Sequence, residues 1–134
     1  MKIIGSSAIR PLICGLTFGV RTNPNATDQQ VQIQVGSLDA TSAGTAGSNP
    51  TPKPSDPQDV AAVCTAGITY SAEPTAYAAT FFMDFDMNQR SLYRYVAEPG
   101  YEFAGAAVAV NGIGVRMTAV TAAVVISVVT QWKE

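Results

Sequence analysis

The chain has 134 residues and a formal net charge of −2, and only 13 % of its residues are charged, against about 25 % in an average soluble protein. Its lysines and arginines are scattered from Lys2 to Lys133, so no basic patch predicts direct contact with nucleic acid. Histidine, the commonest general base and metal ligand, is absent, and we therefore expect neither an enzyme nor a bound cofactor.

The length suits one domain over residues 1–134 that buries a core without disulfides or metal. Cys14 and Cys64 lie in apolar runs, so we expect buried free thiols, although a bridge between them stays open. The start of the chain lacks the apolar core and cleavage site of a signal peptide. The apolar run Ala119–Thr130 is shorter than the ~20 residues that cross a bilayer. We expect a protein that is intracellular when made and has no membrane contact.

The first part of the chain predicts two strands. Residues 1–8 have no periodic pattern and are either a flexible arm that orders against a partner or a frayed end. An apolar run with interior glycines predicts a strand over Leu12–Val20, and Asn23-Pro24-Asn25 predicts a turn. In Gln30–Val35, apolar residues alternate with glutamines, which is the pattern of a half-buried strand.

Residues 39–59 predict a long loop. Small and polar residues are followed by Pro50, Pro52, Pro54 and Pro57, and such a sequence forms neither a sheet ladder nor a long helix. Loops of this length are uncommon in compact domains, so the segment is either disordered or in contact with a partner. After it, Val60–Ala66 could form a short helix begun at Asp56 or a short strand.

The stretch Phe81–Phe103 is rich in aromatic residues and predicts two strands. Over Ala76–Met87 the alternation predicts a core face, Phe81, Met83, Phe85 and Met87, and an opposite face, Phe82, Asp84, Asp86 and Asn88. Ser91–Val96 predicts the next strand, with Tyr93 and Tyr95 opposite Leu92, Arg94 and Val96. We expect the two strands to form a core hairpin.

The end of the chain predicts three more strands. Asn111-Gly112 is a hairpin signal, since both turn positions need positive φ, and it would join Glu102–Val110 to Ile113–Met117. Ala119–Trp132 is rich in β-branched residues and apolar on both faces, so it predicts a long strand that is central or lies at an interface. Seven or eight short strands without a long amphipathic helix predict an all-β chain, an antiparallel β-sandwich or jelly-roll with one long Pro-rich loop.

The acidic residues of this part do not predict a metal or catalytic site. Asp84-Phe85-Asp86-Met87-Asn88 resembles the opening of a calcium loop, but Gln89 and Tyr95 replace the required glycine and bidentate acid. As a catalytic pair, Asp84 and Asp86 share one strand face and could hardly flank a scissile bond.

Arginine and tyrosine near the same strand instead predict a protein interface, because both are enriched there. The alternative for the arginines is an ion pair within the chain, to Glu98, Glu102 or Asp86. Our candidate interface residues are Asp84, Asp86, Asn88, Arg90, Tyr93, Arg94, Tyr95, Lys53 and Trp132.

A series of short motifs follows one order along Thr51–Glu134. They are Thr51-Pro52-Lys53, Asp56-Pro57, Ala61, Thr65-Ala66-Gly67, Met87-Asn88-Gln89-Arg90, Tyr95-Val96-Ala97-Glu98-Pro99-Gly100, Asn111-Gly112-Ile113-Gly114 and a β-branched last strand. This order resembles a family of small virion proteins of tailed bacteriophages. Tyr95 stands where Trp is often found, and Trp132-Lys133-Glu134 replaces the more common Phe-Glu-Glu ending.

The resemblance implies a structural component of the virion. Among such components we expect a decoration (cement) protein on the capsid surface, bound to the major capsid protein and to itself as a dimer or trimer. Ala119–Lys133 and Arg90–Tyr95 are the stretches expected to face other subunits, because large exposed apolar patches are a liability in a monomer. The alternatives are a head–tail connector, a tail or head-fibre component, or a carbohydrate-binding module that stacks sugars on Tyr93, Tyr95, Tyr101 or Trp132.

Overall fold

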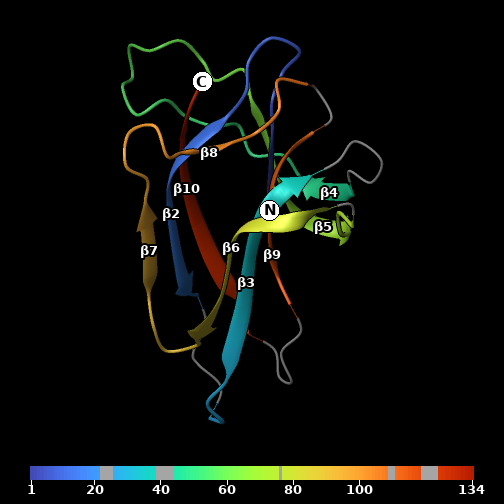
Figure 1. Ribbon diagram of the computed structural model, residues 1–134, viewed down its shortest axis with the longest axis vertical. Coiled ribbons are helices and arrows are strands. Elements are labelled where there is room, and N and C mark those ends of the chain that lie inside the picture. The colour runs from blue at the N-terminus through green and yellow to red at the C-terminus, as the bar shows by residue number, and fades with distance from the viewer. Residues whose placement is uncertain (22–25, 39–43, 76, 109–110, 119–123) are drawn as a thin grey trace.

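The chain folds into two antiparallel β-sheets that face each other as a sandwich (Figure 1). The computed structural model describes residues 1–21, 26–38, 44–75, 77–108, 111–118 and 124–134, and the turn expected at 23–25 lies outside them. The strands of the described residues are β1 (Lys2–Ile4), β2 (Leu12–Val20), β3 (Gln30–Leu38), β4 (Thr45–Ser48), β5 (Thr65–Ala72), β6 (Tyr77–Asn88), β7 (Tyr93–Val96), β8 (Phe103–Ala104), β9 (Gly112–Met117) and β10 (Ile126–Lys133). The all-β expectation is confirmed, with more strands than expected.

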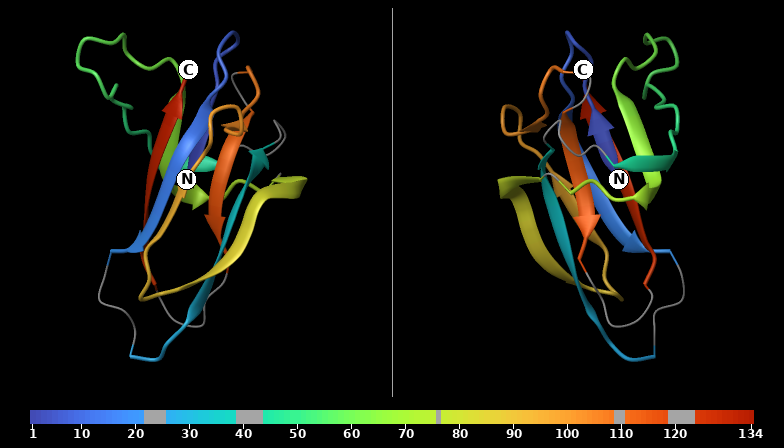
Figure 2. Two further views of the ribbon diagram at one scale, coloured as in Figure 1. Left: turned by 60° about the vertical axis from the view of Figure 1, so that its left-hand side comes forward. Right: turned by 90° about the vertical axis from the view of Figure 1, so that its right-hand side faces the viewer.

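The larger sheet has the order β4-β5-β1-β9-β3-β6, and the smaller has the order β10-β2-β7, with β8 paired to the start of β2. Figure 2 shows the two layers from the side. Between them lies a core to which both sheets contribute: Ile3, Ile13, Leu16, Phe18, Val31, Ile33, Val35, Cys64, Met87, Ile113, Val115 and Val124. The alternation predicted for Gln30–Val35 is confirmed, because Val31, Ile33 and Val35 are all buried in this core.

Residues 1–8 do not form an arm, because β1 is an interior strand of the larger sheet. Ile3 pairs with Ala66 of β5 on one side and with Ile113 of β9 on the other. The Met1 ammonium donates a hydrogen bond to the Val115 carbonyl at 2.9 Å. Burial lowers the pKa of this amino group, and Glu73 acts in the opposite direction. Three residues are too few to show a period, which explains why the sequence pattern missed the strand.

The expected core hairpin within Phe81–Phe103 is wrong, because its two strands belong to different sheets. β6 pairs with β3 at the edge of the larger sheet, and β7 pairs with β2 at the edge of the smaller. Residues 89–92 therefore carry the chain across the sandwich. The alternation predicted correctly which side chains share a face, but it contains no information on which strand lies alongside.

The hairpin expected at Asn111-Gly112 is wrong for the same reason. β8 pairs with β2 in the smaller sheet, whereas Gly112 is already the first residue of β9 in the larger sheet. Among the described glycines, positive φ occurs at Gly44 and Gly100. Gly112 lies instead against β1, where the Ile3 carbonyl would collide with any Cβ.

Phe81 does not share the core face of β6 with Met83 and Phe85. A register shift between Val35 and Gly36 of β3 places an extra residue in β6 at this point, and such a bulge reverses the faces that follow. The Phe81 ring therefore lies over Gly36, where an added Cβ would be 2.7 Å from its Cδ1 atom. Phe82 stacks on Phe103 of β8 instead, with ring centroids 5.1 Å apart.

The loop expected over residues 39–59 is interrupted by β4, which pairs with β5. Residues 49–64 have no strand or helix, and Asp56 closes a turn by accepting the Gln58 N–H at 2.9 Å. Of the two structures proposed for Val60–Ala66, the strand is found only from Thr65 onward. We call residues 49–64 the Pro-rich loop.

The last strand begins later than expected and is an edge strand. β10 spans Ile126–Lys133, residues 119–123 lie outside the described part of the chain, and β10 is the outermost strand of the smaller sheet. A central position is therefore excluded for this strand. The cysteines are both free thiols, Cys64 buried and Cys14 half-buried.

Candidate protein interface

The outer face of the smaller sheet exposes aliphatic side chains to solvent. Val129 of β10 is 59 % exposed and Val96 of β7 is 61 % exposed, and Val125 and Leu92 lie exposed beside the ends of these strands. Alternation causes this exposure, since Val128 and Tyr95 point into the sandwich and their neighbours must point out. We define the outer face by Thr17, Leu92, Arg94, Val96, Val125, Ser127, Val129 and Gln131.

The middle of this face is low. β2 turns Gly15, Thr17 and Gly19 outward, because Leu16 and Phe18 fill the core. Thr17 pairs in register with Val129 on one side and with Arg94 on the other. The middle strand of the face therefore carries small residues, and the Gln131 side chain of β10 lies over Gly15.

The structure therefore joins two stretches that sequence analysis had placed separately. Arg94 on β7 and the outward residues of β10 lie on one face, separated only by β2. Sequence reasoning missed Thr17 as the residue between them, although the glycines of Leu12–Val20 were a signal that this strand exposes little side chain. Lys133, at the end of the face, forms an ion pair with Glu102.

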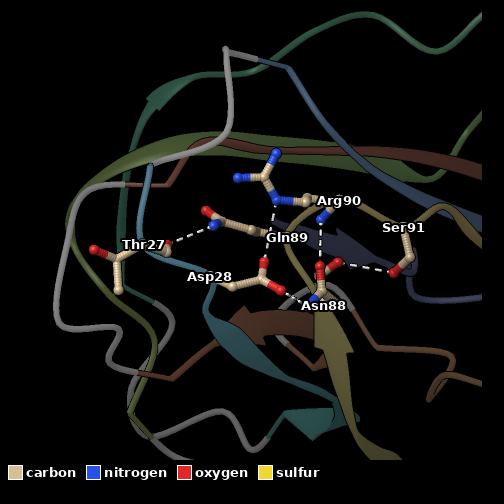
Figure 3. Close-up of polar contacts among 6 residues, drawn as sticks. All are labelled: Thr27, Asp28, Asn88, Gln89, Arg90 and Ser91. Carbon is tan, nitrogen blue, oxygen red and sulfur yellow. Dashed lines mark hydrogen bonds and ion pairs between the residues drawn. The ribbon is translucent and has the colours of Figure 1, made fainter.

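Asn88 and Arg90 lie together at the crossover between the sheets (Figure 3). Asn88 donates from Nδ2 to Asp28 at 3.1 Å, and its own Oδ1 accepts the Arg90 N–H at 2.8 Å. Arg90 Nε lies 3.2 Å from Asp28 Oδ1, and both side chains are more than half exposed. The hydrogen bond from Asn88 is the main cause that lowers the pKa of Asp28. The alternative of an ion pair within the chain thus holds for Arg90, with a partner that sequence analysis did not name.

Gln89, between these residues, is fully buried. Its side-chain amide donates to the Thr27 carbonyl at 2.7 Å, and its backbone N–H donates to the Gln29 carbonyl at 3.0 Å. Polar groups that are buried need such partners. The crossover is therefore fixed to the residues that precede β3, and this corner of the molecule has a structural role.

Asp84 lies on the outward face of the larger sheet in a ladder of polar side chains. Its two carboxylate oxygens accept hydrogen bonds from Gln32 at 2.7 Å and Gln34 at 2.8 Å. The glutamine carbonyls accept in turn from Thr118 at 2.6 Å and Arg116 at 2.8 Å. Asp86 is exposed beside this ladder, in register with Gln32. With every oxygen of the ladder occupied, Asp84 offers little to a partner.

Tyr93 and Tyr95 turn toward the inside of the sandwich rather than to the outer face. The Tyr93 ring lies 4.3 Å from that of Phe85, centroid to centroid, and Tyr95 stacks on Phe103 at 4.7 Å. Burial, followed by the nearby Glu102 and Tyr93, raises the pKa of Tyr95. The first contact joins β7 to β6 across the sandwich, and the second joins β7 to β8 within the smaller sheet.

Lys53 and Trp132 line one pocket of about 630 Å³ between the Pro-rich loop and β10. Glu134 closes the pocket by accepting the backbone N–H groups of Val63 at 2.7 Å and Cys64 at 2.9 Å. Burial acts to raise the pKa of Glu134, but these two hydrogen bonds, together with those from the Trp132 and Cys64 side chains, outweigh it and lower the pKa. Trp132 donates to the same carboxylate at 3.2 Å and packs against the core, so its ring is not free to stack on a ligand.

Among the described residues, no group of three acidic, cysteine or histidine side chains could hold a metal ion. A helix long and apolar enough to cross a membrane is not found in that part of the chain. The chain matches no protein-family model, and comparisons with curated proteins and with solved structures gave no significant similarity.

Proposed function

We propose that this chain is a structural protein of a tailed-bacteriophage virion, and that it binds the capsid lattice as a decoration protein. The observation that carries the proposal is the outer face of the smaller sheet, which exposes Leu92, Val96, Val125 and Val129 around a low middle strand. The order of motifs along Thr51–Glu134 supports the same class of protein.

The composition of the face supports binding to protein. Arg94, on the edge strand β7, is the one charged residue among those that define the face, and an arginine among aliphatic side chains is typical of protein interfaces. An exposed apolar face is unfavourable in water and becomes favourable when a partner covers it. The major capsid protein is the proposed partner, on the capsid surface.

A carbohydrate-binding role has less support. Trp132 packs against the core, and Tyr93 and Tyr95 pack against other rings, which leaves Tyr101, 75 % exposed, as the accessible ring among these four. A connector or tail component would use the same kind of apolar face, so the test has to locate the protein on the particle.

Immunogold labelling of intact particles with an antibody to this chain provides that location in negative stain. Label over the whole shell supports a decoration protein. Label at a single vertex contradicts it in favour of a connector or tail component, and particles without label contradict a virion role.

Co-sedimentation with capsids that lack the protein tests the face itself. Val96→Asp places a charge that loses its hydration in the complex, so we expect at least about tenfold weaker binding. Val60→Asp is the control, because Val60 is 89 % exposed and belongs to the Pro-rich loop rather than to the residues that define the outer face. Equal binding by both variants would contradict the assignment of this face.

A further inference from the structure

Among the described strands, none pairs with β10 on the edge that faces away from β2. On its other edge it pairs with β2 from Ile126 to Lys133. The Arg21 N–H donates to the Val125 carbonyl at 2.9 Å, so the backbone polar groups of Val125 point toward β2. Because this direction alternates along an antiparallel strand, the N–H and C=O groups of Ile126, Val128 and Thr130 point to the open edge.

This edge has few of the usual features that prevent pairing, although the Pro-rich loop lines a pocket beside its second half. Natural edge strands are short, charged, interrupted by proline or covered. From Ile126 to Trp132, β10 has neither a charged residue nor a proline, and Lys133 is its only charge. At the other edge of the same sheet, β7 has only four residues and carries Arg94. Of the two edge strands of this sheet, β10 is therefore the longer and the less protected against pairing.

Space lies beside the second half of β10, where a pocket of about 630 Å³ separates Thr130–Lys133 from the Pro-rich loop. A second pocket, of about 520 Å³, lies under the inward side chains of Ile126 and Val128, between the two sheets. In Figure 2 the Pro-rich loop, in green, stands away from β10, in red. A row of backbone donors and acceptors beside such space is best matched by another polypeptide backbone.

We propose that β10 pairs with β10 of a second copy of this chain, antiparallel, about a two-fold axis at Val129. Each Val128 then exchanges backbone hydrogen bonds with Thr130 of the other copy. The two Val129 residues face each other as a non-hydrogen-bonded pair, in which side chains are closest. The two copies are related by the closed symmetry that is commonest among homodimers.

The side chains of β10 are compatible with this register. Polar Ser127 lies opposite Gln131 of the second copy, and apolar Ile126 lies opposite Trp132. Lys133 lies opposite Val125, so no like charges meet. The two outer faces become one continuous face, twice as wide. This dimer does not depend on the proposed role in a virion, and it is tested without capsids.

Light scattering on the purified protein measures the dimer, and substitutions at Val129 test its centre. The wild-type chain is expected to be a dimer. Val129→Lys and Val129→Glu each place like charges opposite each other in the dimer. The dissociation constant of the dimer should therefore be at least about tenfold higher for each variant alone. An equimolar mixture of the two should dimerise again. Val96→Lys, an exposed change on β7, is the control and should leave the dimer intact.

Disulfide formation tests the register. In a Cys14→Ser background, where Cys64 is buried, oxidised Val129→Cys should form a covalent dimer, because the two Cα atoms would be about 4.5 Å apart. Oxidised Val125→Cys should not form a covalent dimer, because Val125 lies opposite Lys133 of the second copy. The proposal is overturned if the wild-type chain stays monomeric to about 1 mM. It is also overturned if the mixture of Val129→Lys and Val129→Glu does not dimerise, or if Val96→Cys forms the covalent dimer faster than Val129→Cys. If the β10 amides were protected from hydrogen exchange only when the protein is bound to capsids, the proposal would be overturned. A segment of the capsid protein would then be the partner at this edge.

Discussion

Arg90 and Asp28 form an ion pair across 62 positions of sequence, with Arg90 Nε 3.2 Å from Asp28 Oδ1. The pair lies where the chain crosses from β6 in the larger sheet to β7 in the smaller, and Asp28 belongs to the segment that leads into β3. Two long-range connections therefore meet at one corner. Arg94, four residues later, lies on the outer face of the smaller sheet, so the two arginines have different roles.

The first prediction separates these arginines, both of which sequence analysis placed at an interface. Arg90→Ala should lower Tm slightly and leave capsid binding unchanged, because it removes an exposed ion pair, and such pairs contribute little. Arg94→Ala should leave Tm unchanged and weaken capsid binding. Thermal melts and co-sedimentation of both variants provide the comparison. If Arg90→Ala weakened binding as much as Arg94→Ala, the crossover would be part of the interface.

The second prediction concerns acid. The pKa of Asp28 is lowered below its ordinary value of 3.8, first by the hydrogen bond from Asn88. The stabilisation by ionised Asp28 is therefore complete above pH 3.8 and is lost as the pH falls through the lower pKa of the folded state. Asp28→Asn should flatten the dependence of stability on pH in this range, measured by urea unfolding. An unchanged slope would show that Asp28 does not contribute.

The third prediction concerns Gln89, which is fully buried and donates to the Thr27 carbonyl. Gln89→Ala removes the hydrogen bond to that carbonyl and opens a cavity, so the free energy of unfolding should fall by about 2–3 kcal/mol. Ser91→Ala is the control at the same corner, because the Ser91 hydroxyl is exposed and donates only to the Asn88 carbonyl. Equal losses in the two variants would contradict a special role for the buried amide.

Side-chain periodicity predicted the faces of the strands well and their neighbours poorly. Val31, Ile33 and Val35 are buried as their alternation predicted. The partners of β6 and β7 could not be predicted, because alternation is the same whether the next strand along the chain lies in the same sheet or in the other. Arg90 was assigned to an interface because Asp28 is remote in sequence. The outer face was partly predictable, since Arg94 and the last strand were named, but only the strand order joins them.

The fourth prediction tests the contact between β1 and β9. Gly112→Ala would place a methyl group against the Ile3 carbonyl, and the backbone of an interior strand cannot move away easily. We expect the free energy of unfolding to fall by about 1–3 kcal/mol or more. Gly19→Ala is the matched control, because the atom nearest to its added Cβ is Leu92 Cδ1 at 3.8 Å. A Gly112→Ala protein as stable as Gly19→Ala would show that β1 does not hold this position.

The fifth prediction concerns the Cys64 thiol, whose reactivity reports on the anchor of the Pro-rich loop. Burial, followed by the nearby Glu134 carboxylate, raises its pKa to about 11. At pH 8 only about one thiol in a thousand is then ionised. Because the side chain is also buried, Cys64 should react with iodoacetamide far more slowly than half-buried Cys14. Mass spectrometry after timed labelling measures both rates.

Removal of the anchor should raise the reactivity of Cys64. Glu134→Ala eliminates the hydrogen bonds to the Val63 and Cys64 N–H groups and the charge that disfavours the thiolate. The Pro-rich loop should open more often, and the labelling rate of Cys64 should increase while that of Cys14 stays the same. Glu102→Ala removes a different carboxylate, the partner of Lys133, and should not affect Cys64. If Glu134→Ala also left Cys64 unreactive, burial alone would protect the thiol, and the carboxylate would not hold the loop.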